Sequence, residues 1–233
     1  MKATETFEEI TVFGARGHSL MILRGLEEYW RGRVKIRALI DDIAHGFDHP
    51  ALSVPVISSD ERLRRFPHLP VLLTVSNPGL RGRVARRLQA EGATLATAIC
   101  PERINLDPAA RFGPGSVCMP WTRIGPDVTT GPCTIMLASI IAHDVEIGAF
   151  TTLAGDALVS GHVRIGDRVS IAPRAVIANG HRNRWLTIGD DAEIGVGAAV
   201  LGNVAAGERV IGNPAMPIRH WVRLRRLARG KDG

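Results

Sequence analysis

Residues 135–177 read IMLASIIAHDVEIGAFTTLAGDALVSGHVRIGDRVSIAPRAVI and contain the repeat from which the architecture is predicted. A branched aliphatic residue recurs at every sixth position, usually followed by a small residue, and the fourth residue after it is again small or β-branched. No helix or alternating strand has this period, whereas the coils of a parallel β-helix do. The aliphatic series is Ile135, Ile141, Ile147, Leu153, Val159, Ile165, Ile171 and Ile177, resuming at Ile188, Ile194 and Val200.

The repeat predicts a three-sided stack in which each six-residue segment forms one side of a coil. The aliphatic residues point inward and stack on their equivalents above and below, so stability accumulates along the stack. Two irregularities are expected. The segment NGHRNRWL (179–186) interrupts the repeat and should loop out of a corner, and the phase slips upstream, around CMPWTRIGPDV (118–128).

Residues 1–98 predict a separate α/β domain. Strand-like runs alternate with helix-like runs, which is typical of a small parallel sheet. The expected strands are ITVF (10–13), VKIRALIDD (34–42), VLLTVSNP (71–78) and TLATAI (94–99), and the expected helices are LMILRGLEEYWRG (20–32), DERLRRF (60–66) and LRGRVARRLQAEG (80–92).

A glycine-rich turn follows the first of these strands. The pattern is Gly14-Ala15-Arg16-Gly17-His18, which has the position and chemistry of a loop that binds nucleotide phosphates. Asp41 and Asp42 end the next strand, where a carboxylate often meets a ribose or a base. The alternative is structural, because a glycine here also lets a helix and a strand pack closely.

The composition restricts the class of protein. The chain has 233 residues with a net charge of +6, and 45% are hydrophobic but only 5% aromatic. No apolar run is long enough to span a bilayer, the polar N-terminus lacks a signal-peptide core, and Cys100, Cys118 and Cys133 have no metal-like spacing. We therefore expect a cytoplasmic protein with buried thiols.

The basic C-terminal tail, residues 217–233, is interpreted as a solvated helix with an arginine face. Such a tail could also bind anionic lipid or phosphorylated ligands. Because the chain contains no nucleic-acid-binding motif, no nucleic-acid partner is expected.

An α/β domain followed by a hexapeptide array resembles a family of bacterial sugar acyltransferases, which includes sialic-acid O-acetyltransferases and nucleotide-amino-sugar N-acetyltransferases. The resemblance covers residues 10–216. It rests on FGARGH (13–18), IDD (40–42), the array with AHD (142–144), SGHVRIGD (160–167) and the closing IGNPA (211–215). It implies a Rossmann-like domain over 1–98, a left-handed parallel β-helix over 99–216 and a homotrimer that uses acetyl-CoA and no metal.

The resemblance also implies roles for individual residues. His143 corresponds to the general base and Asp144 to the carboxylate that orients it. Acetyl-CoA would lie in the groove between neighbouring β-helices, along Thr152, Gly161, Pro173 and Val196. The nucleotide of the sugar would lie on Arg16, Gly17, His18, Asp41, Asp42 and Ser76.

The chemistry of these residues fits acyl transfer by direct attack. A thioester is already activated, so the main requirement is a base that takes the proton of the acceptor, and histidine is suited to this near neutral pH. The backbone N–H of Gly161 is a candidate donor to the oxyanion. No cysteine adjoins His143 in sequence, so no acyl-enzyme is expected.

The leading hypothesis is N-acetylation of a nucleotide-linked amino sugar, and the first alternative is O-acetylation of a sialic acid or a related sugar. Two further alternatives stay open. His143, His162 and His181 are each 19 residues apart and could bind zinc, as in β-helical carbonic anhydrases. The chain could also be a non-catalytic binding module.

Overall fold

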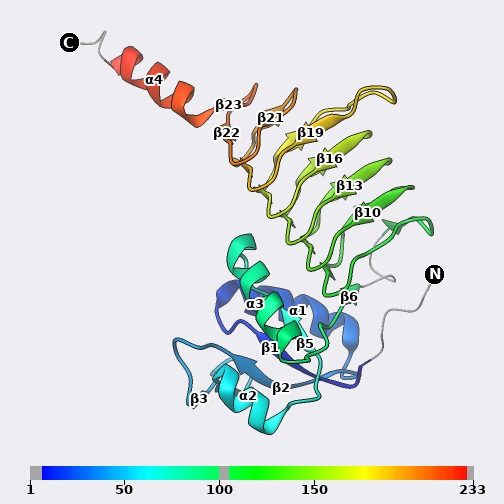
Figure 1. Ribbon diagram of the computed structural model, residues 1–233, viewed down its shortest axis with the longest axis vertical. Coiled ribbons are helices and arrows are strands. Elements are labelled where there is room, and N and C mark those ends of the chain that lie inside the picture. Colours follow the sequence, from blue (N-terminus) through cyan, green and yellow to red (C-terminus); the bar gives the residue numbers. More distant parts are fainter. Residues whose placement is uncertain (1–6, 100–104, 230–233) are drawn as a thin grey trace.

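The computed structural model describes residues 7–99 and 105–229 (Figure 1). An α/β domain is followed by a stack of β-coils, and a helix at the C-terminal end extends away from the stack. Within the described residues, no helix is both long and apolar enough to cross a membrane.

The N-terminal domain is built on a five-stranded sheet in the order β3-β4-β2-β1-β5. Only β3 is antiparallel to its neighbour, so the core of the sheet is parallel, as the alternating pattern predicts. The strands are β1 (Glu9–Phe13), β2 (Lys35–Ile40), β3 (Phe47–Asp48), β4 (Pro55–Ile57) and β5 (Val71–Leu73), and the helices are α1 (Gly17–Trp30), α2 (Ser59–Arg65) and α3 (Pro78–Ala90).

The helix starts follow local chemistry. Ser58 accepts a hydrogen bond from the backbone N–H of Glu61 at the start of α2. Asn77 does the same for Leu80 at the start of α3, with Pro78 in the first turn. Helix α1 is different, because the side chain of Arg16 forms no capping hydrogen bond with the first backbone N–H groups of the helix.

One predicted strand belongs elsewhere. The run 94–99 was expected as a strand of the N-terminal sheet, but its strand pairing with that sheet is limited to an isolated bridge between Val71 and Leu95. Its last two residues form β6 (Ala98–Ile99), which pairs with β8 of the coil stack. The fourth parallel strand of the N-terminal sheet is β4, which was not predicted because three residues are too few to show an alternating pattern.

The stack has three parallel faces, with sheets of eight, six and four strands. Only β23, at the C-terminal end, is antiparallel. The eight-stranded sheet contains β6, β8 (Val117–Cys118), β11 (Ile135–Met136), β14 (Thr152–Leu153), β17 (Ser170–Ile171), β20 (Glu193–Ile194), β22 (Arg209–Ile211) and β23 (Met216–Pro217). The six-stranded sheet contains β7 (Asn105–Leu106), β9 (Arg123–Ile124), β12 (Ile140–Ile141), β15 (Leu158–Val159), β18 (Val176–Ile177) and β21 (Ala199–Val200). The four-stranded sheet contains β10 (Val128–Thr130), β13 (Val145–Ile147), β16 (Val163–Ile165) and β19 (Leu186–Ile188).

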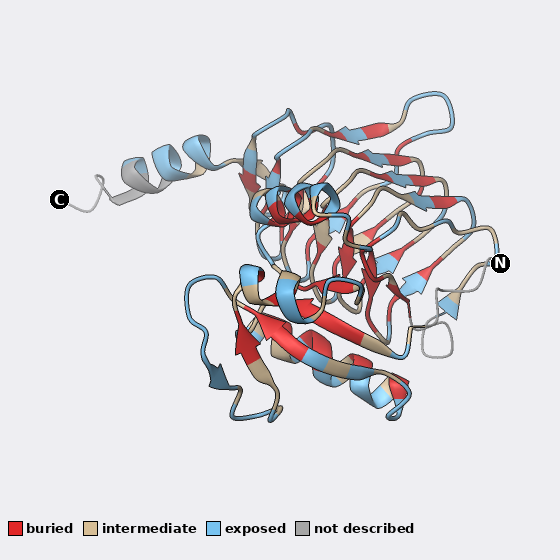
Figure 2. Cartoon of the chain, turned by 60° about the horizontal axis from the view of Figure 1, so that its bottom comes forward, coloured by how far each residue is buried: buried red, intermediate tan, exposed pale blue. Residues whose placement is uncertain are grey.

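The predicted inward aliphatic series is confirmed from Ile141 onward, where these side chains form one buried core. Figure 2 shows buried segments in red along the strands of the stack. The start of the series is wrong by one residue. Met136, not Ile135, pairs with Leu153 and lies in the core of the stack, whereas Ile135 packs with the core of the N-terminal domain. The phase slip therefore lies just after Met136, later than the segment 118–128 suggested.

Arg81 joins the two parts of the chain. It is buried on α3 and donates hydrogen bonds to the carbonyl oxygens of Cys133, Val75, Ser76, Phe150 and Thr151 and to Oγ1 of Thr152. Burial lowers its pKa to about 10, so it is a cation at neutral pH. The α/β domain is thus held against the first coils of the stack.

The basic tail forms α4 (Ile218–Arg229), in agreement with the predicted C-terminal helix. Leu224 and Leu227 are exposed on it, and Arg219 pairs with Glu208 of the last coil at 3.2 Å.

Candidate functional site

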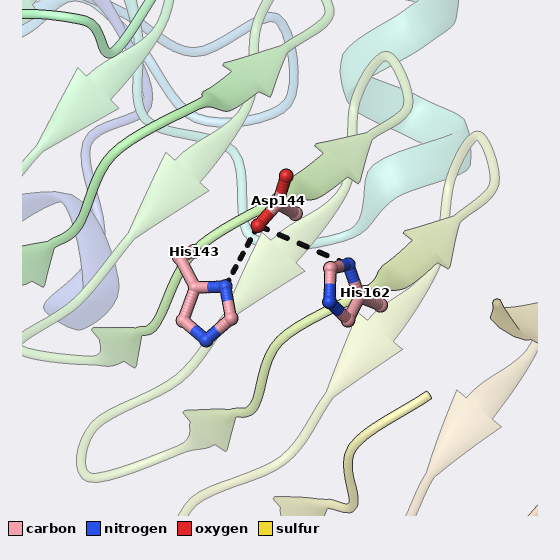
Figure 3. Close-up of side chains that lie close together, drawn as sticks. All are labelled: His143, Asp144 and His162. Carbon is pink, nitrogen blue, oxygen red and sulfur yellow. Dashed lines mark hydrogen bonds and ion pairs between the residues drawn. The ribbon is translucent and has the colours of Figure 1, made fainter. Parts of the chain in front are cut away.

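His143 and Asp144 lie together at a corner of the stack, between β12 and β13 (Figure 3). Nδ1 of His143 is 2.8 Å from Oδ2 of Asp144, and both side chains are partly exposed. Asp144 has a φ of 52°, and residues at many other corners also have positive φ. Aspartate tolerates this left-handed conformation better than most residues, so the corner itself favours an aspartate here.

The hydrogen bond from His143 is the main cause that lowers the pKa of the Asp144 carboxyl, and the charges of His162, His143 and Arg182 act in the same direction. Asp144 is therefore an anion at neutral pH and can hold the imidazole through Nδ1. That arrangement leaves Nε2 of His143 free to accept a proton.

His162 occupies the equivalent corner one coil further along. Its Nδ1 is 3.8 Å from Oδ2 of Asp144, and no hydrogen-bond partner reaches this buried atom among the described residues (Figure 3). Its ring meets those of His143 and Trp185 edge-on, at centroid distances of 5.4 and 5.8 Å. The second histidine thus belongs to the same cluster as the predicted base.

Gly161 lies directly under the imidazole of His143. A Cβ at this position would be 2.5 Å from Cε1 and 2.8 Å from Nε2 of His143. Its role as an oxyanion donor is wrong for this conformation, because its N–H already donates to Oδ1 of Asn179 at 2.8 Å. What the position provides is room for the ring.

Five of the six residues predicted to bind a nucleotide line one cavity of about 560 Å³ in the N-terminal domain: Arg16, His18, Asp41, Asp42 and Ser76. Gly17, the sixth, is the first residue of α1. Gly14 has a φ of 129°, and a Cβ there would collide with the side chains of Ser19 and Thr74, which explains a glycine in this turn.

The two aspartates have different local partners. Asp41 accepts from the backbone N–H groups of Ile43 and Ala44 and from Arg16, whereas Asp42 accepts from Ser59 and Arg87. For both carboxyls burial raises the pKa, but these donors outweigh it and the pKa is lowered. Asp42 thus fixes the start of α2 as well as lining the cavity.

A second cavity, of about 610 Å³, lies between the two domains. His18 and Ser76 line both cavities, so the two spaces share a wall. Of the residues expected to contact acetyl-CoA, Thr152 and Pro173 line this second cavity. Val196 is exposed at a corner further along the stack, and Gly161 lies beside His143.

Sequence reasoning missed the contribution of α3 to the nucleotide cavity. Leu80, Arg83, Val84 and Arg87 line it. Their spacing of three to four residues puts them on one face of the helix, so the signal was present in the sequence. The spacing did not indicate that this face of α3 lies toward the cavity.

Three side chains of the corner cluster could each offer one ligand atom to a cation, namely His143, Asp144 and His162. His181 is not among them, since it lies in the segment that leaves the corner. The set of three histidines considered for zinc is therefore not assembled.

Comparisons with known proteins agree with the fold of the chain. No family model matches the chain. The chain is 34% identical over 148 residues to the GDP-perosamine N-acetyltransferase of Escherichia coli O157:H7, which is 63% of this chain and 66%, just under two thirds, of that enzyme. WeeI from Acinetobacter baumannii AYE is 28% identical with a TM-score of 0.82, covering 90% of this chain and 99% of that one. A variant of the GDP-perosamine N-acetyltransferase of Caulobacter crescentus, solved with CoA and GDP-perosamine, is 25% identical with a TM-score of 0.77, covering 90% and 96%.

Proposed function

Because the chain belongs to the hexapeptide-repeat sugar acyltransferases, we propose that it transfers the acetyl group of acetyl-CoA to the amine of a nucleotide-linked amino sugar. The observation that carries the proposal is the His143–Asp144 pair, exposed at a corner of the β-helix with Nδ1 engaged at 2.8 Å. The named substrates of the relatives favour a GDP-linked 4-amino sugar.

In the proposed reaction, His143 acts as general base. The amine attacks the carbonyl carbon of the thioester while Nε2 of His143 takes its proton. The tetrahedral intermediate then collapses, the C–S bond breaks, and the proton passes from His143 to the thiolate of CoA. Asp144 keeps Nδ1 protonated throughout, so the base always presents the correct nitrogen.

The N-terminal domain would bind the nucleotide in Rossmann-like fashion. Support comes from the cavity that Arg16, His18 and Asp41 line, beside the N-terminus of α1, which has no side-chain cap. Phosphates are stabilised at such a helix end by the backbone N–H groups and by the helix dipole. The left hand of the β-helix and assembly of the chain into a homotrimer belong to the same proposal.

A second copy of the chain would complete the site. His143 lies on the corner between the six- and four-stranded sheets, whereas Thr152, Ala154 and Pro173 line the interdomain cavity near the corner between the eight- and six-stranded sheets. The two corners are opposite edges of the six-stranded face. A homotrimer in which this edge of one protomer meets the other edge of its neighbour would bring the cavity and the base together.

The test is release of CoA thiol from acetyl-CoA against UDP-, dTDP- and GDP-linked 4-amino sugars. We expect turnover with at least one amine, and a loss of roughly 10²- to 10⁴-fold in kcat for His143→Ala. His68→Ala is the control, because this exposed histidine lines none of the described cavities. One set of assays includes a metal chelator, because His143, Asp144 and His162 could offer ligand atoms to a cation. The chelator should leave turnover unchanged.

Other outcomes would contradict the proposal. Turnover only with a sugar that offers hydroxyls would replace N-acetylation by O-acetylation. Unchanged turnover in His143→Ala would remove the base, and ligand binding without turnover would favour a binding module.

A further inference from the structure

The interruption of the repeat folds into a short hairpin, residues 179–185, at the corner between β18 and β19. The backbones of His181 and Arg184 exchange two hydrogen bonds, of 2.9 and 2.8 Å. The coils on either side are not disturbed, because Val163 pairs with Leu186 in regular parallel register. We refer to residues 179–185 as the corner hairpin.

The corner hairpin is fixed to the coil that carries His162. Oδ1 of Asn179 accepts from the N–H of Gly161, and the N–H of Gly180 donates to the carbonyl of Gly161 at 3.0 Å. Trp185 packs edge-on against His162, and the guanidinium of Arg164 lies 4.4 Å from the centre of the indole ring. These contacts join the base of the hairpin to the same cluster as His143.

The hairpin carries two cations without acidic partners. Arg182 and Arg184 are exposed, and neither forms an ion pair with any of the residues that the structure describes. Four other arginines of the stack are paired: Arg164 with Glu146, Arg168 with Asp191, Arg174 with Asp156 and Arg209 with Glu193. The charge of Arg182 nevertheless contributes to lowering the pKa of the Asp144 carboxyl, so it acts on the His143 corner.

We propose that Arg182 and Arg184 bind the phosphate groups of acetyl-CoA while its thioester lies at His143. The inference rests on the proposed function. The hairpin is on the same edge of the stack as His143 and two coils further along, roughly 10 Å away at about 4.8 Å per strand. A guanidinium presents a fork of donors that matches phosphate, and two uncommitted forks so placed would hold the charged end of an extended thioester.

The phosphates of the nucleotide sugar are a poorer match for these arginines. The cavity expected to bind that nucleotide lies in the N-terminal domain and has its own cations, Arg16, Arg83 and Arg87. The interdomain cavity beside it is lined by Thr152 and Pro173, two of the residues expected to contact acetyl-CoA, and in the proposed homotrimer it would meet the His143 edge of a neighbouring protomer. The acetyl donor is therefore the ligand assigned to the hairpin.

The experiment compares acetyl-CoA with acetyl-pantetheine, which carries the same thioester but no phosphate. In the full-length double variant Arg182→Ala/Arg184→Ala, the KM for acetyl-CoA should rise about tenfold or more, because charge-assisted hydrogen bonds to phosphate are lost. The KM values for acetyl-pantetheine and for the sugar nucleotide should not change. The rise should shrink at high salt, where the wild-type contact is itself screened.

Arg64→Ala is the matched control, since it removes an exposed cation from α2 in the other domain and should leave every KM unchanged. Arg182→Lys/Arg184→Lys keeps the charge and should recover part of the affinity. Binding of CoA by calorimetry gives a readout that needs no turnover. If the wild type binds CoA but acetylates nothing, the proposed function fails while the hairpin is still tested by its effect on the Kd of CoA.

Two results would overturn the inference. One is an unchanged Kd for CoA and an unchanged KM for acetyl-CoA in a folded double variant. The other is an equal rise in KM for acetyl-pantetheine, which would mean that the substitutions disturb the cluster around His162 and not a phosphate contact.

Discussion

At position 161 the absence of a methyl group decides where the imidazole of His143 can lie. A Cβ there would come within 2.8 Å of Nε2, the atom proposed to take the proton. The backbone of Gly161 does not have positive φ, so alanine brings no backbone strain. The ring has to move instead, because it is the flexible neighbour.

We therefore predict that Gly161→Ala lowers kcat by about 10²-fold through displacement of the base, while stability changes by no more than about 1 kcal/mol. Steady-state kinetics and urea unfolding of the same preparation measure both quantities. Gly202→Ala is the control, since a Cβ at this exposed position meets nothing within 4 Å. Equal kinetics for the two variants would show that the close approach to His143 has no role in turnover.

At this scale the sequence was informative about the pair and less so about its surroundings. The AHD corner predicted that His143 and Asp144 lie together, and they do. The engagement of the Gly161 N–H by Asn179 was not predictable, because it depends on a side chain from the next coil. His162 follows His143 by 19 residues. The two rings meet because one coil of the stack has a similar length, which the residue types alone do not indicate.

At the scale of elements, α3 is the connection between the domains, and Arg81 makes it. Its guanidinium satisfies carbonyl oxygens on both sides of the boundary and Oγ1 of Thr152 at 2.8 Å. An apolar side chain of similar length would leave these buried acceptors without donors.

We predict that Arg81→Met reduces the free energy of unfolding by about 3 kcal/mol or more, whereas Arg86→Met on the exposed face of the same helix costs no more than about 0.5 kcal/mol. The comparison is made by urea unfolding at neutral pH, where Arg81 is charged. Similar values for both variants would mean that the buried hydrogen bonds contribute little net stability.

Element boundaries were predictable where a pattern was long. Helices α1, α2 and α3 and the coils after Met136 follow the expected segments. Residues 94–99 did not, because a short apolar run satisfies either sheet equally and tertiary packing decides between them. The repeat is one residue short between Met136 and Ile141, and the sequence did not indicate this. Ile135 and Met136 are both apolar, so either of them could begin the inward series.

For the whole molecule, the positions of His143 and the interdomain cavity make a prediction about assembly. Because this cavity and His143 lie on opposite edges of the six-stranded face, we expect the cavity of one protomer to cooperate with His143 of its neighbour. Gly155→Trp would fill the cavity, since a Cβ at Gly155 meets only the carbonyl oxygen of Leu137, at 3.7 Å.

We predict that Gly155→Trp and His143→Ala are each inactive alone, and that dissociating and reassembling them together restores about a quarter of wild-type activity. The fraction follows because half of the cavities and half of the bases are intact, and they combine at random. Thiol release before and after mixing measures it, with each variant mixed with itself as the control. No recovery from verified mixed oligomers would mean that each chain uses its own cavity with its own base.

The corner hairpin also bears on how the proposed acyltransferase can change in evolution. Val163 and Leu186 pair in regular register although the segment between them is longer than in the other coils. The β-helix therefore accommodates an insertion without distorting the neighbouring coils. We expect exchanges at exposed positions of the hairpin, such as Arg182 and Arg184, to leave His143 in place, because Asn179 and Trp185 hold the base of the hairpin against the coil. Selectivity for the proposed cosubstrate could thus evolve by substitution of a few solvent-facing residues, with little loss of stability.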